Sequence, residues 1–201
     1  MAATVDHLAK YGPVGTQPQD VCAELGISKA LVNYHFGGRE GLIAEALTVA
    51  YEARSKEMAE VAQSVQLGAP ATAALESIIE SHVRWGGEQP GLAAATAYPE
   101  LAVGRSAITQ PQLDRLRAAG EQNFASMQSV VLAARLELTG GRPFEGEHAA
   151  RVMAAIIGWM TLGMLVWNGG TYLPTQGIEQ QVGFDAARQH LYAIVRDALT
   201  H

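Results

Sequence analysis

The chain has 201 residues, of which 48% are hydrophobic and 17% are charged, and its formal net charge at pH 7 is -6. This composition fits one or two folded domains with a sizeable core, and it excludes a disordered tail. An acidic chain gives no global sign of nucleic-acid binding, so any such function has to rest on local features. The single cysteine, Cys22, excludes an internal disulfide and a thiolate metal cluster, and it fits a reducing cytoplasm.

We expect no signal peptide, because the first residues do not show a basic segment followed by an apolar run. The most apolar stretch, residues 152–167, is interrupted only by Gly158, Thr161 and Gly163. It is about four residues short of the roughly 20 that a membrane-spanning helix needs. We therefore expect a helix that is buried on all sides in a cytoplasmic protein, and a membrane segment is the alternative.

Glycine and proline divide the chain into helical segments, and no segment alternates apolar and polar residues as a half-buried β-strand does. The sequence therefore predicts an all-α fold with about nine helices. They are expected over residues 2–11, 17–25, 29–35, 39–66, 71–86, 92–103, 110–138, 146–168 and 184–200.

Local signals mark the ends of the second and third predicted helices. Thr16 and Gln19 have the spacing of a capping box at the start of the second helix, and Ser28 is a capping residue for the third. Gly26 and the pair Gly37-Gly38 follow these helices, where a left-handed backbone conformation ends a helix without steric cost.

Residues 17–36 hold the most specific functional pattern. Two short helices joined by the three-residue turn Gly26-Ile27-Ser28 form a helix-turn-helix arrangement, whose second helix fits the major groove of DNA. Apolar residues at helical spacing would pack the two helices together, and the polar residues of the second helix would meet base edges and phosphates. The predicted DNA contacts are Thr16, Gln17, Ser28, Lys29, Asn33, Tyr34, His35 and Arg39.

Two alternatives remain open for this segment. The two helices can form a purely structural corner, and the Tyr34 side chain can face the protein instead of DNA. Phe36 and Cys22 are expected in the core.

The stretch LGISKALVNYHFGGREGLIAEAL, which spans residues 25–47, resembles the helix-turn-helix signature of the tetracycline-repressor (TetR) family. The matching positions are Gly26, Ile27, Ser28, His35, Phe36, Arg39, Glu40 and Leu42. The close match covers about 45 residues, and the remainder agrees only in length and helix count.

The resemblance implies a DNA-binding domain over residues 1–46 and a ligand-binding and dimerisation domain over residues 47–201. It also implies a homodimer that pairs through a four-helix bundle of the last two helices, binds a DNA operator, and is a repressor by default. The alternative for these two helices is that both lie inside one subunit.

Three features depart from the family pattern. The printed sequence begins inside the first helix, so we expect no contribution from a basic N-terminal arm. Residues 1–46 hold three basic and five acidic residues, a net charge of -2, and Gly38 replaces the usual polar cap before Arg39. We therefore expect modest electrostatic affinity for DNA.

The C-terminal part is expected to enclose a pocket for a small hydrophobic or aromatic effector that shifts the protein away from its DNA-binding arrangement. Methionine would give this pocket an adaptable wall, but each candidate residue can equally belong to the core, and His82 can be a core histidine. The candidates are His82, Trp85, Tyr98, Phe124, Met127, Met153, Ile157 and Met160.

One short motif bears on the hypothesis that the protein is an enzyme. Residues 145–148 read Glu-x-x-His, the ligand spacing of di-iron helical bundles, but such sites need two of these strings and two further glutamates. We therefore expect no enzyme, no metal and no cofactor. The alternative function is a dimeric helical small-molecule-binding protein that does not bind DNA.

Overall fold

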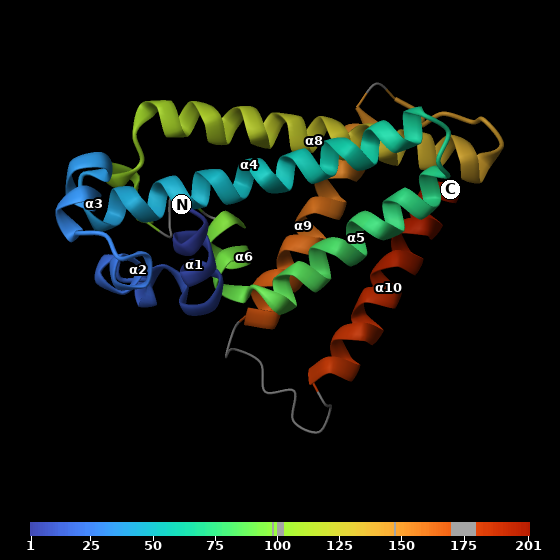
Figure 1. Ribbon diagram of the computed structural model, residues 1–201. Coiled ribbons are helices and arrows are strands. Elements are labelled where there is room, and N and C mark those ends of the chain that lie inside the picture. The colour runs from blue at the N-terminus through green and yellow to red at the C-terminus, as the bar shows by residue number, and fades with distance from the viewer. Residues whose placement is uncertain (98, 100–102, 147, 170–179) are drawn as a thin grey trace.

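The computed structural model describes residues 1–97, 99, 103–146, 148–169 and 180–201. Within these residues every regular element is helical, which confirms the all-α prediction (Figure 1). The elements are α1 (Ala2–Gly15), α2 (Pro18–Leu25), α3 (Lys29–Phe36), α4 (Arg39–Gln66), α5 (Ala71–Glu88), α6 (Pro90–Ala97), η1 (Arg105–Ala107), α8 (Gln110–Thr139), α9 (Ala149–Gly169) and α10 (Gln180–Thr200).

Glycines at the predicted breaks adopt the conformations that end helices. Gly26 and Gly37 have φ values of 64° and 70°, as expected of residues that terminate α2 and α3. Gly12, with φ of 66°, interrupts α1 where the sequence predicts its end, but a further turn continues to Gly15. Pro13 fits this second turn because it follows the interruption, where no helical hydrogen bond to its nitrogen is needed.

Neither of the two predicted capping residues makes a capping hydrogen bond. The Thr16 hydroxyl donates back to the carbonyl of Gly12 at 2.8 Å, so it does not accept from Gln19, and Gln17 occupies the cap position of α2. Ser28 stands at the cap position of α3, but its side chain makes no capping hydrogen bond. A capping box forms instead at the start of α8, where the amide of Thr109 donates to Oε1 of Gln112 at 2.9 Å.

The long helices α4 and α8 run side by side, with α1, α2 and α3 at one end of the pair and α5, α9 and α10 toward the other (Figure 1). Arg115 of α8 fixes their register because it donates to both carboxylate oxygens of Glu52, at 2.7 and 2.6 Å, and to Glu45 at 2.8 Å. Burial by itself would raise the pKa of Glu45, but hydrogen bonds from Arg115 and Gln112 outweigh it and lower that pKa.

The core formed by the described residues consists of three hydrophobic clusters that α4 connects. A small cluster of Cys22, Val32 and Leu42 holds α2 and α3 against the start of α4. A second cluster joins α1, α4, α6 and α8 around Leu8 and Leu47, and the third lies between α4, α5, α8, α9 and α10. Because α4 continues across residue 46 and the second cluster contains residues from both sides, the two expected domains share packed side chains.

The apolar helix α9 differs from expectation in one respect. Ala154, Ile157 and Thr161 are buried, but Val152 and Trp159 are exposed, so the helix is not buried on all sides within one chain. In the part of the chain that the structure describes, none of the helices has the length and apolar character needed to cross a membrane.

Candidate DNA-binding surface and ligand cavity

The turn between α2 and α3 brings the polar side of α3 to the surface. Val32 points into the small cluster with Cys22 and Leu42, and Phe36 is partly buried against them. Of the predicted α3 contacts, Lys29, Asn33, Tyr34 and His35 are all exposed. Tyr34 is 84% exposed, and its ring lies edge-on to His35 with 5.0 Å between ring centroids, so it does not face the protein.

Arg39 does not present its guanidinium to the α3 surface. Its Nε donates to the carbonyl of Thr16 at 3.1 Å, and its Nη2 donates to the carbonyls of Pro13 and Val14, the latter at 3.2 Å. Its Nη1 pairs with Glu40. Arg39 therefore ties the start of α4 to the α1–α2 connection, which does not support its predicted role as a DNA contact.

The predicted contacts before α2 are also less available than expected. Thr16 is fully buried, and both its hydroxyl and its carbonyl are engaged within the protein, which argues against a DNA contact. Gln17 is half-buried and donates to the Val14 carbonyl at 3.2 Å. Ser28 is exposed beside Lys29.

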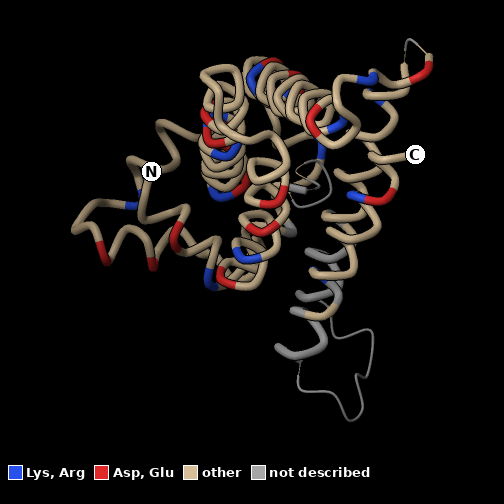
Figure 2. The backbone as a smooth tube through the Cα atoms, turned by 90° about the vertical axis from the view of Figure 1, so that its right-hand side faces the viewer, with Lys and Arg blue, Asp and Glu red and all other residues tan. Residues whose placement is uncertain are grey.

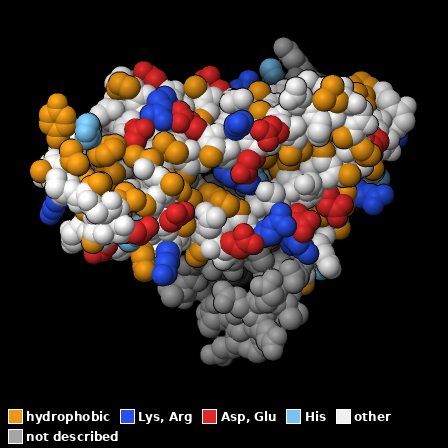
Figure 3. Space-filling model, viewed as in Figure 1, with side chains coloured by type: hydrophobic (Ala, Val, Ile, Leu, Met, Phe, Trp, Pro, Cys, Tyr) orange, Lys and Arg blue, Asp and Glu red, His pale blue; other side chains and the backbone are white. Residues whose placement is uncertain are grey.

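Charge contributes little to this end of the molecule. Residues 1–46 contain Lys10, Lys29 and Arg39 as their only cations, and Arg39 is committed to internal contacts. Figure 2 shows Lys and Arg interspersed with Asp and Glu along the chain instead of gathered in a basic stripe. The end formed by α1–α3 displays mostly apolar and uncharged side chains (Figure 3). Leu31 and Tyr34 are exposed on α3.

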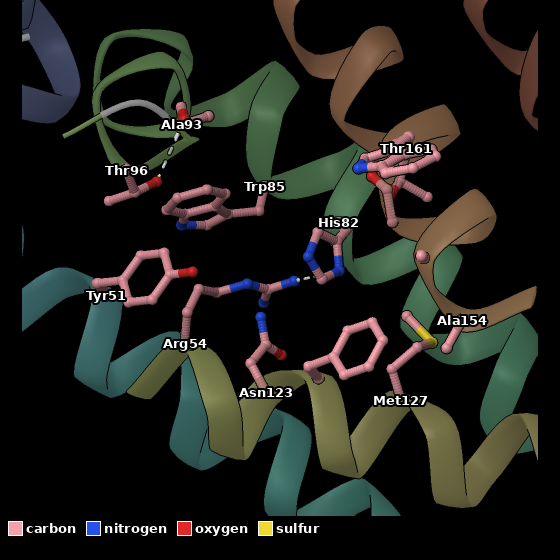
Figure 4. A pocket seen from close by; sticks show the side chains of 15 residues that line it. Tyr51, Arg54, His82, Trp85, Ala93, Thr96, Asn123, Met127, Ala154 and Thr161 are labelled. Carbon is pink, nitrogen blue, oxygen red and sulfur yellow. Dashed lines mark hydrogen bonds between the residues drawn. The ribbon is translucent and has the colours of Figure 1, made fainter. Parts of the chain in front are cut away.

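A cavity of about 430 Å³ lies between α4, α5, α6, α8 and α9. Its volume is in the range of pockets that hold drug-sized ligands. Aromatic and apolar side chains, including Trp85, Phe124 and Met127, form much of the wall. Figure 4 shows polar side chains that converge on the same space from several helices. These polar lining residues are Tyr51, Arg54, His82, Thr96, Asn123 and Thr161.

The predicted pocket residues divide into three groups. His82, Trp85, Phe124 and Met127 line the cavity. Tyr98 lies outside the described residues. The other three are not among the described lining residues: Ile157 is fully buried in the third hydrophobic cluster, and two partly buried methionines pack against that cluster. Those methionines are Met153 and Met160.

The cavity residues that α4 contributes were not predicted from the sequence. Arg54 and Tyr51 follow the apolar stripe of a long helix, where a polar residue is normally assigned to the solvent face. Arg54 is only 9% exposed, however, and its guanidinium lies over the Trp85 ring at 5.2 Å from the centroid. A basic residue in the middle of a buried helical stripe was the available signal.

Arg54 and His82 set the electrostatics of the cavity. Nη2 of Arg54 lies 2.9 Å from Nδ1 of His82. Burial, assisted by the positive charge of Arg54, lowers the pKa of His82 to about 4. His82 is therefore neutral at physiological pH, and Arg54 is the only formally charged group among the described lining residues.

Helix α6 connects the cavity wall to α1. Ala93 and Thr96 line the cavity, whereas Leu92 and Ala95 belong to the second cluster with Leu8 of α1. A β-carbon on Gly91 would lie 2.6 Å from the Leu8 carbonyl oxygen, so α6 approaches the α1 backbone as closely as only glycine permits. Helix α6 is thus packed directly against both the cavity and α1.

The Glu-x-x-His segment does not assemble a metal site among the described residues, since no group of three or more His, Cys, Asp or Glu side chains is placed to hold a metal ion. Glu147 lies outside the residues that the structure describes.

Comparison with known proteins agrees with this geometry. Residues 1–46 match the family model described as bacterial regulatory proteins, tetR family. No curated protein sequence matches the chain.

Two solved structures resemble the fold over nearly the whole chain. One is the TetR family transcriptional regulator PfmR from Thermus thermophilus, with a TM-score of 0.63, 19% identity, and coverage of 96% of this chain and 97% of that one. The other is described as a transcriptional regulator from Pseudomonas aeruginosa, with a TM-score of 0.52, 20% identity, and coverage of 98% and 89%. At these identities the likeness shows the fold.

Proposed function

We propose that this chain, whose residues 1–46 match the family model of bacterial regulatory proteins of the tetR family, is a ligand-responsive repressor. In this proposal α3 binds the major groove of a DNA operator, and a small molecule in the cavity releases the protein from that operator. The observation that carries the proposal is that α3 exposes its polar residues to solvent while Val32, on its opposite side, packs against Cys22 and Leu42.

The proposed DNA contacts are the exposed residues of α3. Lys29 supplies the charge for a phosphate or a guanine, and Asn33 can pair with an adenine edge. Tyr34 and His35 offer hydrogen-bond donors for phosphate oxygens. With only a few cations available, direct base contacts and groove shape would supply more of the affinity than phosphate neutralisation does.

The proposed response to ligand follows the contacts of α6. A molecule that fills the cavity pushes against Ala93 and Thr96, and Gly91 passes the displacement to α1. The ligand favours an arrangement in which α3 no longer fits its half-site, which is a shift between two populations. A ligand with equal affinity for both arrangements would have no effect.

We propose that two chains pair through α9 and α10. The exposed apolar residues Val152, Ile156 and Trp159 recur on one face of α9, and Ile194 is exposed on α10. Large apolar side chains in solvent are typical of surfaces that another protein covers. A dimer would present two copies of α3, as half-site recognition requires.

A mobility-shift experiment tests the DNA-binding part of the proposal. DNA from upstream of the protein's own gene serves as the probe, and Lys29→Ala combined with Tyr34→Ala is compared with wild type. We expect the double variant to lose the shift while its circular dichroism and melting temperature stay unchanged, because both side chains are exposed.

Lys56→Ala is the matched control, since this α4 lysine is highly exposed and lies outside the proposed contacts. An unchanged shift in the double variant would show that α3 is not the reading helix. If the wild type shifts no DNA, the alternative of a dimeric small-molecule-binding protein is favoured, in line with the net negative charge of residues 1–46.

A further inference from the structure

We propose that the cavity selects an organic anion, meaning a molecule with an apolar body and one anionic oxygen group such as a carboxylate, which Arg54 binds. This inference rests on the ligand-responsive function proposed above and specifies the chemistry of the effector. It starts from a cation that is enclosed by side chains and incompletely paired.

Arg54 has donors to spare inside the cavity. A guanidinium carries five N–H groups. Nη1 contacts Oε2 of Glu57 at 2.5 Å and Oγ of Ser81 at 3.0 Å, and Nη2 contacts His82. Nε is buried and has no hydrogen-bond partner among the residues that the structure describes. A buried donor without a partner costs free energy, and an anionic ligand would recover it.

The positive charge of Arg54 is only partly compensated. Within the described part of the chain Glu57 is its one acidic contact, and the side chain of Glu57 is 61% exposed, so water screens its charge. Glu57 does not line the cavity, and the described lining residues include no carboxylate. An entering ligand therefore meets one cation and no opposing anion, which favours a negative group over a neutral or positive one.

His82 supplies a second hydrogen-bond donor for the anionic group of the ligand. Arg54 can only donate, so its 2.9 Å contact makes Nδ1 of His82 the acceptor and leaves the ring proton on Nε2. The contact of Nδ1 with the Ile78 carbonyl is longer, at 3.3 Å, and would need the opposite tautomer. The charge-assisted contact is the stronger of the two.

The remaining wall defines the body of the ligand. Trp85 and Phe124 provide aromatic surface, and Met127 provides an adaptable contact. Asn123 lines the same space, and its buried Oδ1 has no hydrogen-bond partner in the described residues. A hydroxyl or N–H group on the ligand body would satisfy this acceptor, whereas the apolar surface around it excludes a highly polar molecule.

A matched pair of fluorescent probes tests the charge preference on the wild-type protein. The two probes, 8-anilinonaphthalene-1-sulfonate and N-phenyl-1-naphthylamine, share their aromatic rings and differ by the sulfonate. We expect the sulfonate to bind saturably and about 10- to 100-fold more tightly than the neutral probe, as a charge-assisted hydrogen bond implies. Equal affinity, tighter binding of the neutral probe, or no saturable sulfonate binding would overturn the inference.

A substitution then assigns the preference to Arg54. Arg54→Gln should remove the advantage of the sulfonate and leave the affinity for the neutral probe within about threefold. Arg117→Gln is the control, because this exposed α8 arginine carries the same charge and does not line the cavity. Retention of the sulfonate preference in folded Arg54→Gln would contradict the assignment.

If Arg54→Gln does not fold, a competition experiment on wild type decides. 4-Phenylbutanoate should displace the sulfonate probe at a concentration at least about tenfold lower than 4-phenylbutanamide does. Equal displacement by acid and amide would sink the inference. These binding measurements do not involve DNA. If an anion binds in the cavity but does not release the protein from its operator, the proposed ligand-responsive repression is refuted and the anion site still stands.

Discussion

Nε of Arg39 donates to the carbonyl oxygen of Thr16 at 3.1 Å, which joins the first residue of α4 to the connection between α1 and α2. The side chain of Arg39 thereby holds together the three segments that orient α3. The family resemblance had suggested an arginine that reaches for DNA, but a guanidinium whose donors are engaged by three carbonyls and a carboxylate has little left to offer a phosphate.

Arg39→Ala should therefore destabilise the protein. It removes hydrogen bonds that a charged donor makes to partly buried carbonyls, and we expect a loss of about 1.5–3 kcal/mol in the free energy of unfolding. Urea unfolding followed by circular dichroism measures this loss, with Lys29→Ala as the control that should change stability by less than about 0.5 kcal/mol. If Arg39→Ala is as stable as wild type but binds DNA more weakly, Arg39 contacts DNA as the sequence predicted.

DNA binding should depend only weakly on salt. Lys10 and Lys29 are the cations of residues 1–46 that are not committed to backbone carbonyls. If both neutralise a phosphate, the slope of log K against log salt concentration is about -2 for each chain, and Lys29→Ala reduces its magnitude by about 1. Fluorescence anisotropy across a salt titration from about 50 to about 300 mM measures the slope, and a much steeper dependence would indicate basic contacts from the rest of the chain.

Gly91→Ala should disturb the connection between the cavity and α1. The new β-carbon would lie 2.6 Å from the Leu8 carbonyl oxygen and 2.8 Å from the Gly12 nitrogen, so the α1 and α6 backbones must separate. We expect a cost of about 1–3 kcal/mol in stability and a changed affinity for DNA. Lys56→Ala, on the exposed side of α4, is the control. Identical behaviour of the two variants would argue against α6 as the connection.

The sequence predicted the order and type of the helices because glycine and proline act locally. Gly26 and Gly37 end their helices by adopting positive φ values, a local preference of glycine that can be recognised in sequence. The capping hydrogen bonds predicted at Thr16 and Ser28 do not form, because a hydroxyl group can bond to several neighbouring backbone groups with similar energies. For Thr16, the carbonyl of Gly12, freed by the interruption of α1, was the competing partner.

The candidate site was less predictable because it depends on tertiary packing. Exposure of Lys29 and Tyr34 follows from helical periodicity, whereas the engagement of Arg39 depends on carbonyls more than twenty residues away. Arg54 escaped prediction for the same reason: its cavity is formed only where five helices meet. Ile157 shows the converse, since an apolar residue one helical turn from the cavity is indistinguishable from a lining residue in sequence.

Acid should destabilise the protein through His82. Its pKa is about 4 in the folded state and close to 6.5 when unfolded, so the unfolded state binds the extra proton first. The contribution of neutral His82 to stability is complete above pH 6.5 and is lost as the pH falls from 6.5 toward 4, by about 2–3 kcal/mol. Urea unfolding across this range should show a flatter pH profile for His82→Gln, which keeps a side-chain acceptor for Arg54 but does not titrate.

The acidic groups with lowered pKa values affect stability in a lower pH range than His82 does, so the two effects can be measured separately. Glu45 and Glu137 accept hydrogen bonds in the folded state, and the bonds from Arg115 and Thr72, respectively, help to lower their pKa values below 4.5. Their contribution to stability is therefore present at pH 4.5 and above and disappears only at lower pH. A loss between pH 6.5 and 4.5 that persists unchanged in His82→Gln would refute the assignment to this histidine.

The exposed apolar face of α9 gives the last prediction. Ile156 is partly exposed among Val152 and Trp159, the latter 71% exposed, and a charge introduced there would be buried unpaired if another chain covers the face. Ile156→Glu combined with Ile194→Glu should convert a dimer of two 21.3 kDa chains into monomers in sedimentation experiments.

Leu67→Glu is the matched control, because this leucine at the end of α4 is 82% exposed and lies outside the α9 and α10 face. The control should stay dimeric, since a carboxylate there remains in water. The monomeric variant should bind DNA more weakly because a single α3 reads only one half-site. A wild-type chain that sediments as a monomer would contradict the pairing, and the exposed Trp159 would then need another partner.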